Sequence, residues 1–185
     1  MISVIDNLMS DNFVMWYHKL HESDIAWYYK PWTVDPTYGL NEPSENKQDN
    51  HGQFCHVFYM DDKINSDFFI NGPQKIITEI EKLNKRKFTR PYRIKSNLTM
   101  CKNREDDTVG TVHTDYNTKN TYMSAIYYIH DTDGDTFFYD KSGKITKRVS
   151  PKQNRCVVFP SEMLHAGQTP KENEVRMVTN IVMVK

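Results

Sequence analysis

Long apolar runs are missing from this chain of 185 residues, whose hydrophobic residues make up 38% of the sequence. None of its runs approaches the roughly 20 apolar residues that are needed to span a bilayer. The first ten residues include Asp6 and lack the pattern of a signal peptide. We therefore expect neither a membrane span nor an export signal.

Net charge is also missing, because 24 lysines and arginines balance 24 aspartates and glutamates. The charges are interspersed, without long blocks of one sign. A large surface for nucleic acid or another polyanion would need an excess of basic residues. The sequence therefore predicts no nucleic-acid partner.

Cysteines are few: Cys55, Cys101 and Cys156 are an odd number and form no Cys-x-x-Cys pair. This usage is typical of reduced thiols in an intracellular protein and excludes a disulfide framework. Without an export signal, it predicts a cytoplasmic location. A chain of this length is most simply one domain with a substantial core.

The N-terminal half predicts two helices. Ser10 suits an N-cap, and Phe13, Trp16, Tyr17 and Leu20 follow at the spacing of one helical face. His18 and His21 are interpreted as a solvated flank of this helix. Pro73 suits the first position of a second helix, whose buried stripe is expected at Ile76, Ile77, Ile80 and Leu83.

The polar segment 31–53 lies between these helices and is too long for a simple connection. A segment of this kind is typical of a functional loop. We interpret it as a candidate lid, with Trp32 and Tyr38 as residues that contact a substrate.

After residue 88 the pattern changes to short strands separated by turns. Strands are expected at 92–100, 111–113, 122–130, 136–139, 145–149, 156–159, 165–168 and 175–184. About eight short strands in succession indicate a sandwich or jelly roll. The expected fold is mainly β, with N-terminal helices that pack on one sheet and cover it.

Three residues of this β region have the chemistry of a metal site. His113 and Asp115 are one residue apart at the end of an apolar stretch, and His165 follows in the small-residue context His165-Ala166-Gly167. Two histidines and one carboxylate form the facial triad of non-haem Fe(II) oxygenases. Arg176 lies within an apolar strand, where a cation needs a partner.

From about Arg90 onward the sequence resembles the 2-oxoglutarate- and Fe(II)-dependent oxygenases, particularly their small prolyl-4-hydroxylase-like branch. The motifs that carry the resemblance are 113–115, 125–129, 133–138, 154–160, His165-Ala166-Gly167 and Arg176. The resemblance implies a double-stranded β-helix, a cupin-like jelly roll, with iron at its open end. It divides the single domain into residues 1–88, which provide support and the candidate lid, and a core of residues 89–185.

By this resemblance His113, Asp115 and His165 would ligate Fe(II), and Arg176 would bind the distal carboxylate of 2-oxoglutarate. Tyr128 matches a tyrosine that donates to the same carboxylate in some members, and is equally well explained as a core aromatic. The serine or threonine that often follows the arginine by two residues is Val178 here. Asn180, on the same strand face, is a candidate substitute, and Asn97 is a further candidate of the co-substrate pocket. The usual Gly-Gly pair is Asp133-Gly134.

The implied reaction is hydroxylation of a C–H bond with dioxygen and 2-oxoglutarate, for which ascorbate is a candidate reductant. The small-molecule co-substrate would act with a peptide or protein substrate, such as a peptidyl proline, or with a free amino acid or other small molecule. A base demethylase would need a further arginine and a basic face. A cupin-type enzyme would usually add histidines near His113. A non-catalytic jelly-roll binding module is the alternative from another class.

Overall fold

The computed structural model of this chain describes residues 1–35, 42–85, 87–102, 107–119 and 121–185. A large antiparallel sheet has the strand order β1-β11-β8-β13-β6-β4-β2, and the short β5 pairs with β4. The bounds of its strands are β1 Ser3–Ile5, β2 Tyr28–Lys30, β4 Gln53–Met60, β5 Lys63–Ile64, β6 Arg90–Met100, β8 Tyr122–Tyr128, β11 Cys156–Pro160 and β13 Val175–Val184.

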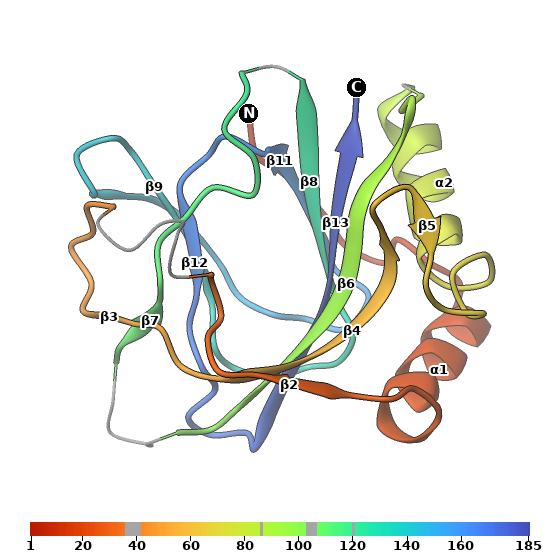
Figure 1. The fold of residues 1–185 in the computed structure, drawn as a ribbon, viewed down its shortest axis with the longest axis horizontal. Coiled ribbons are helices and arrows are strands. Elements are labelled where there is room, and N and C mark those ends of the chain that lie inside the picture. Colours follow the sequence, from red (N-terminus) through yellow and green to blue (C-terminus); the bar gives the residue numbers. More distant parts are fainter. Residues whose placement is uncertain (36–41, 86, 103–106, 120) are drawn as a thin grey trace.

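A small antiparallel sheet has the order β10-β9-β12, and a short parallel pair joins β3 to β7. Their bounds are β3 Gln48–Asp49, β7 Val109–Gly110, β9 Thr136–Tyr139, β10 Ile145–Val149 and β12 His165–Gly167. Figure 1 shows the small sheet on one side of the large sheet and the helices on the other. Phe138 and Val149 of the small sheet pack with Tyr128, Phe159 and Val178 of the large sheet. The two sheets therefore enclose one apolar core between them.

Two helices cover the other face of the large sheet. They are α1 (Asp11–Lys19), continued by the π-helical turn η1 (Leu20–Asp24), and α2 (Pro73–Asn84). Tyr17 and Ile76 of these helices are buried in one cluster with Ile94 and Ile181 of the sheet. Packing of this kind stabilises short helices more than their intrinsic propensity does. Ser10 is at the N-cap of α1 as expected, but its side chain forms no capping hydrogen bond.

The mainly β fold with N-terminal helices confirms the fold class, and the two facing sheets form the expected jelly roll. No helix of the described ranges is long and apolar enough to cross a membrane. The expected strand at 111–113 is wrong, because pairing by β7 ends at Gly110 and only an isolated bridge joins His113 to His165.

Three details of the helices also differ from expectation. Leu83 is exposed rather than buried, because it lies near the end of α2, whose buried residues end at Ile80. Trp16 is exposed as well, whereas Tyr17 is buried. The interpretation of His21 as solvated is wrong: it is buried, accepts a hydrogen bond from Ser96 and contacts the Tyr17 carbonyl.

The segment between β2 and β4 is attached to the small-sheet side of the molecule where it is described. Gln48 and Asp49 pair with Val109 and Gly110, and the Tyr139 hydroxyl donates to Asn46. Tyr38 lies outside the described residues, and Trp32 is 38% exposed. Residues 44–50 therefore extend the small-sheet layer, and the lid stays a prediction.

Candidate metal centre

His113 and His165 are brought together by a reciprocal pair of backbone hydrogen bonds. The His113 amide donates to the His165 carbonyl at 3.0 Å, and the His165 amide donates to the His113 carbonyl at 2.9 Å. Because His165 belongs to β12, this pair fixes the loop that carries His113 against the small sheet. The two imidazole rings are 4.5 Å apart between centroids.

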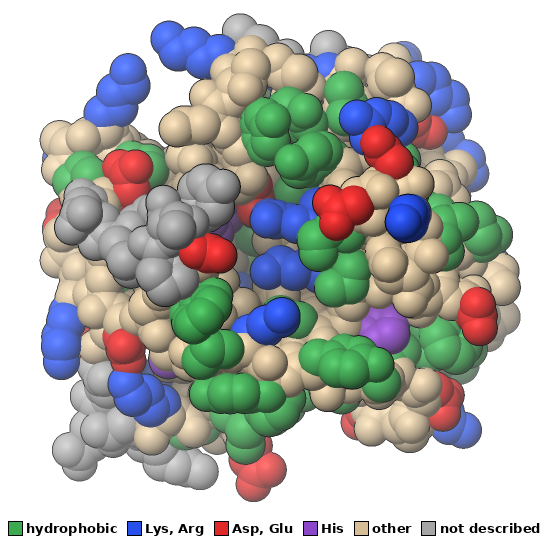
Figure 2. Space-filling view, in the orientation of Figure 1, with side chains coloured by type: hydrophobic (Ala, Val, Ile, Leu, Met, Phe, Trp, Pro, Cys, Tyr) green, Lys and Arg blue, Asp and Glu red, His purple; other side chains and the backbone are tan. Residues whose placement is uncertain are grey.

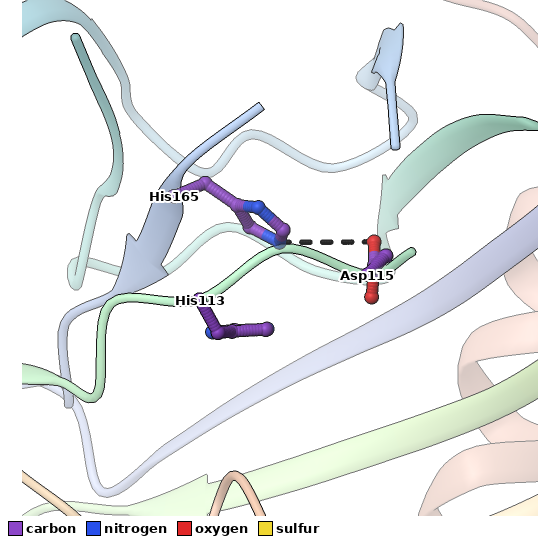
Figure 3. A group of neighbouring side chains, drawn as sticks. All are labelled: His113, Asp115 and His165. Atoms are coloured by element: carbon purple, nitrogen blue, oxygen red, sulfur yellow. Dashed lines mark ion pairs between the residues drawn. The ribbon is translucent and has the colours of Figure 1, made fainter. Parts of the chain in front are cut away.

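Asp115 completes a compact group with these histidines. One ligand atom from each of the three side chains lies within 4.8 Å of the others, and the His165 Nε2 is 3.7 Å from the Asp115 Oδ2 (Figure 3). The side chains of Asp115 and His165 are buried. The structure thus brings together the three residues that the sequence predicts as ligands.

Both imidazoles present the same nitrogen to the group. The Nδ1 atom of His113 is 2.8 Å from the Thr111 carbonyl, and that of His165 is 3.0 Å from the Met163 carbonyl. A carbonyl only accepts, so each Nδ1 carries a proton, and in the neutral form of each ring Nε2 offers its lone pair. Carbonyl partners of this kind orient the histidine ligands of metal sites.

Asp115 is held by two donors from the large sheet. The Arg93 guanidinium of β6 donates to Oδ1 at 2.7 Å, and the Ser124 hydroxyl of β8 donates to Oδ2 at 2.7 Å. Ser124 also contacts the Ser161 hydroxyl at 2.8 Å. Burial raises the pKa of Asp115, but His165 and Arg93 outweigh it, so its pKa lies below the usual value. The carboxylate is therefore ionised at neutral pH.

The protonation state of His113 also suits a metal. Burial, with a smaller effect of His165, lowers the pKa of His113 to about 3. Its imidazole is neutral above that pH, as a ligand must be. Two imidazole nitrogens and one carboxylate that converge in this way fit the donor set of a ferrous facial triad. Such a set leaves coordination positions open for other molecules.

Arg176 lies on β13 beside β9 and β12. Its Nε donates to the Gly134 carbonyl at 2.7 Å, its Nη2 donates to the Thr136 hydroxyl at 2.9 Å, and it lies over the Tyr128 ring. Within the described residues Nη1 forms no hydrogen bond. A Cβ atom at Gly167, two residues from His165, would be 3.3 Å from Nη1. Arg176 is therefore a buried cation beside the triad strand, with one nitrogen available to an anion.

The structure explains locally why Asp133-Gly134 replaces the Gly-Gly pair that the resemblance implies. Gly134 has a φ of +89°, and a Cβ atom there would be 2.7 Å from the Gln168 carbonyl, so this position requires glycine. The Asp133 carboxylate accepts hydrogen bonds from the amides of Lys171, Glu172 and Asn173. It thereby holds the turn that precedes β13, a task that a second glycine could not perform.

The other predicted pocket residues share the inner face of the large sheet. The Tyr128 hydroxyl donates to Thr136 at 2.8 Å, so this tyrosine supports the arginine's partner. Val178 packs in the core between the sheets. Asn97 accepts a hydrogen bond from the Cys55 thiol at 3.4 Å, and the buried Oδ1 of Asn180 has no partner among the described residues. Their roles toward 2-oxoglutarate stay predictions.

Three residues near this centre are not predicted from the sequence. They are Arg93 and Ser124, which both donate hydrogen bonds to Asp115, and Lys95 on the same face of β6 as Arg93. Arg93 and Lys95 alternate with Ile94 and Ser96, a pattern typical of a strand with one face in solvent. Only the register of the sheet shows that the charged face is the inner one. A basic pair in alternation on the long strand about twenty residues before the His-x-Asp motif was the available signal.

A comparison with protein families identifies a match over part of this chain. Residues 99–183 match the model of the 2OG-Fe(II) oxygenase superfamily. This match confirms, over those residues, the resemblance that the motifs indicated. No curated protein matches the chain.

Solved structures share the fold at low sequence identity. An oxidoreductase of the 2OG-Fe(II) oxygenase family from Burkholderia pseudomallei has a TM-score of 0.69 at 10% identity, over 98% of this chain and 84% of that one. A prolyl-4-hydroxylase from Pseudomonas putida has a TM-score of 0.62 at 12% identity, over 100% and 91%. The α-ketoglutarate-dependent epimerase SnoN of nogalamycin biosynthesis has a TM-score of 0.62 at 13% identity, over 100% and 78%.

Proposed function

We propose that this chain, whose residues 99–183 match the 2OG-Fe(II) oxygenase superfamily, is an Fe(II)- and 2-oxoglutarate-dependent dioxygenase that hydroxylates a C–H bond. The observation that carries the proposal is the convergence of His113, Asp115 and His165 within 4.8 Å. Their orientation supports it, because both Nδ1 protons are engaged by carbonyls and the carboxylate is ionised.

Each side chain has a distinct task in this proposal. The Nε2 atoms of His113 and His165 and a carboxylate oxygen of Asp115 would hold the iron. Arg176 would bind the distal carboxylate of 2-oxoglutarate, with Gly134 and Thr136 fixing two of its nitrogens. Tyr128 would position Thr136, and Asn180 and Asn97 would contact the co-substrate from the same sheet face.

When bound, iron and 2-oxoglutarate would supply the oxidation: dioxygen, 2-oxoglutarate and a C–H bond give succinate, carbon dioxide and an alcohol. The protein's contribution is to fix geometry and exclude water. The apolar core formed by Phe138, Phe159 and Val178 lies between the sheets beside the candidate site. Ascorbate is proposed as an accessory reductant.

For the substrate we propose a peptidyl proline as the first class to test, since the structures that share the fold include prolyl hydroxylases. One is from Pseudomonas putida, and another, from Trichoplax adhaerens, is in complex with a peptide fragment. SnoN is an epimerase of nogalamycin biosynthesis, and one of its structures contains nogalamycin RO, so a small-molecule substrate is the alternative within the same chemistry.

The test is an anaerobic titration with Fe(II) and 2-oxoglutarate, followed by visible absorption. We expect a weak metal-to-ligand charge-transfer band that is absent in His113→Ala and in Asp115→Ala. Arg176→Met should need more 2-oxoglutarate to reach the same band. Succinate release on admission of air, measured with proline peptides and with free amino acids, then identifies the substrate class.

A negative result would be equally clear. If the wild-type protein binds Fe(II) and shows no band with 2-oxoglutarate, the proposal is wrong. The chain would then be a jelly-roll binding module or an enzyme with another co-substrate. Lys75→Met is a suitable control, because Lys75 is exposed on α2, on the opposite face of the sheet.

A further inference from the structure

The inner face of the large sheet is the face toward the small sheet. It is apolar on one side and polar on the other. Cross-strand pairs point to the same face, so the pairs Asn180↔Lys95, Val178↔Asn97 and Cys55↔Asn97 place these residues with Arg176 on the inner face. On β8 this face is apolar, with Ile126 and Tyr128 packed against the small sheet. Over β6 and β4 it is polar.

The polar side of this face is basic. Lys95 and Arg93 belong to it on β6, and Lys30 belongs to it on β2 through its pairing with Gln53. Figure 2 shows lysine and arginine side chains gathered in a depression in the middle of the face that carries them. The packed core between the sheets involves β8, β11 and β13, so the basic side is the open one.

Lys95 is a cation without a counterion. Among the described residues its ammonium group forms no hydrogen bond and no ion pair. Burial, and to a smaller extent Arg93, lowers the pKa of Lys95. The carboxylate of Asp115, which raises the pKa of Lys95 to a small extent, is already held by Arg93 and Ser124. A half-buried ammonium in this position has lost hydration without gaining a partner, which is costly unless a ligand supplies one.

Asn180 gives an independent sign of a ligand at the same place. It is the cross-strand partner of Lys95, is 9% exposed, and its Oδ1 is buried without a hydrogen-bond partner. The Nε of Arg93 is likewise buried without a partner. Native proteins rarely leave such groups unsatisfied. The Nε of Arg93 donates and suits a carboxylate, whereas the Oδ1 of Asn180 accepts and suits an N–H or O–H group of the same ligand.

The charge balance of the proposed site points to the sign of that ligand. The charges of a ferrous ion, Asp115, Arg176 and the 2-oxoglutarate dianion cancel. Arg93 and Lys95 then remain as two positive charges on the same face. Neither is neutralised by the cofactors of the proposed reaction.

We infer that the substrate of this enzyme carries a carboxylate, which is bound by Lys95 beside Asn180 on the open side of the inner face. The inference rests on the proposed function and specifies its substrate class. Arg93 contributes charge but is already engaged with Asp115, so Lys95 is the residue that contacts the carboxylate. The carboxylate belongs to a free acid or to an acidic residue of a peptide, which bind by the same chemistry.

The test compares acids with amides of the same shape. The probes are L-glutamate with L-glutamine, and the peptide Gly-Glu-Pro-Gly with Gly-Gln-Pro-Gly. Binding to the protein loaded with Mn(II) and 2-oxoglutarate is measured by calorimetry. We expect at least one acid to bind about tenfold more tightly than its amide, and the pair that shows the preference identifies a free acid or a peptide.

Variants of Lys95 assign the preference to this residue. Lys95→Met should abolish the preference for the acid, Lys95→Arg should retain it, and Lys75→Met should have no effect. Calorimetry with 2-oxoglutarate should give unchanged affinity in Lys95→Met. If 2-oxoglutarate affinity falls as much as acid affinity does, the lysine binds the co-substrate and the inference is wrong.

The same samples separate the two proposals. The charge-transfer band with Fe(II) and 2-oxoglutarate is recorded first. Absence of the band in wild-type protein contradicts the proposed function. A normal band with no acid preferred over its amide overturns the substrate inference alone.

Discussion

Arg93 on β6 donates a hydrogen bond of 2.7 Å to Asp115, the only carboxylate of the candidate triad. The arginine is half-buried, whereas the aspartate side chain is completely buried. The pair sets the orientation of the carboxylate and keeps it ionised before any metal arrives. The large sheet thus orients the carboxylate of a candidate ligand, which is carried by the loop after β7.

Replacing Arg93 by Met tests this preparation. Partners of metal-ligating side chains typically contribute about 10- to 100-fold in metal affinity. We expect Fe(II) to bind about tenfold more weakly to Arg93→Met, because the lost orientation outweighs the removal of a positive charge. Anaerobic competition with a coloured chelator measures this affinity. An unchanged affinity would show that Arg93 does not assist metal binding, and a higher affinity would show that its charge opposes the metal.

Replacing Gly167 by Ala tests the free nitrogen of Arg176. The added methyl group would lie 3.3 Å from Nη1 and 3.5 Å from Cζ, against the edge that remains open to an anion. We expect the KM for 2-oxoglutarate to rise several-fold while Fe(II) affinity is kept. Arg176→Met is the matched comparison, and it should raise the same KM further. If Gly167→Ala leaves the KM unchanged, 2-oxoglutarate does not use this edge.

Protonation of His21 should destabilise the fold in mild acid. Burial lowers its pKa from 6.5 to about 4, so the unfolded state binds more protons between these values. The free energy of unfolding therefore falls as pH falls from 6.5 towards 4, by roughly 2 to 3 kcal/mol from this residue. Urea unfolding of His21→Gln should show a shallower pH dependence over this window. Lys75→Met, at an exposed position of α2, is the control and should keep the wild-type slope.

Asn154 should be required for docking of the N-terminal segment. Its Oδ1 accepts hydrogen bonds from the Met9 amide and the Tyr127 hydroxyl, and its Nδ2 donates to the Met9 carbonyl. Its φ is +63°, which favours asparagine or glycine. We expect Asn154→Ala to lower the free energy of unfolding by about 3 kcal/mol. The loss in Asn154→Gly should be about 1 kcal/mol smaller than the loss in Asn154→Ala, because glycine adopts a positive φ without strain. Equal losses in urea unfolding would show that backbone conformation is not part of the effect.

The sequence predicts strands well where a run of buried, β-branched and aromatic residues marks the strand. The apolar run of β8 and the long β13 are buried on both faces, and their β-rich composition identifies them directly. It fails at 111–113, because that apolar stretch is buried by contacts of a loop with β12 rather than by a ladder. An apolar stretch of sequence indicates that its side chains are buried. Burial occurs both in strands and in packed loops, so it does not distinguish the two.

In the candidate site, too, some residues can be predicted from the sequence and others only from the structure. His113, Asp115 and His165 are found from residue type and order, because metal chemistry needs those side chains. Arg93, Lys95 and Ser124 are found only from the register of the large sheet, which brings β6 and β8 to either side of β13. Asn180 is predicted from its spacing after Arg176, but only the structure shows that its buried Oδ1 has no partner among the described residues.

The central position of β13 has a consequence for how the chain folds during synthesis. This strand lies between β6 and β8, yet it is translated after both of them. Until it emerges from the ribosome, each of these strands presents an open edge, and such edges promote pairing with other chains. The two halves of the large sheet, and with them Lys95 on one side and Ser124 on the other, can be joined only in the final step. Completion of the sheet and arrival of Arg176 are therefore one event, so an interrupted polypeptide would have an open sheet and would also lack this buried cation.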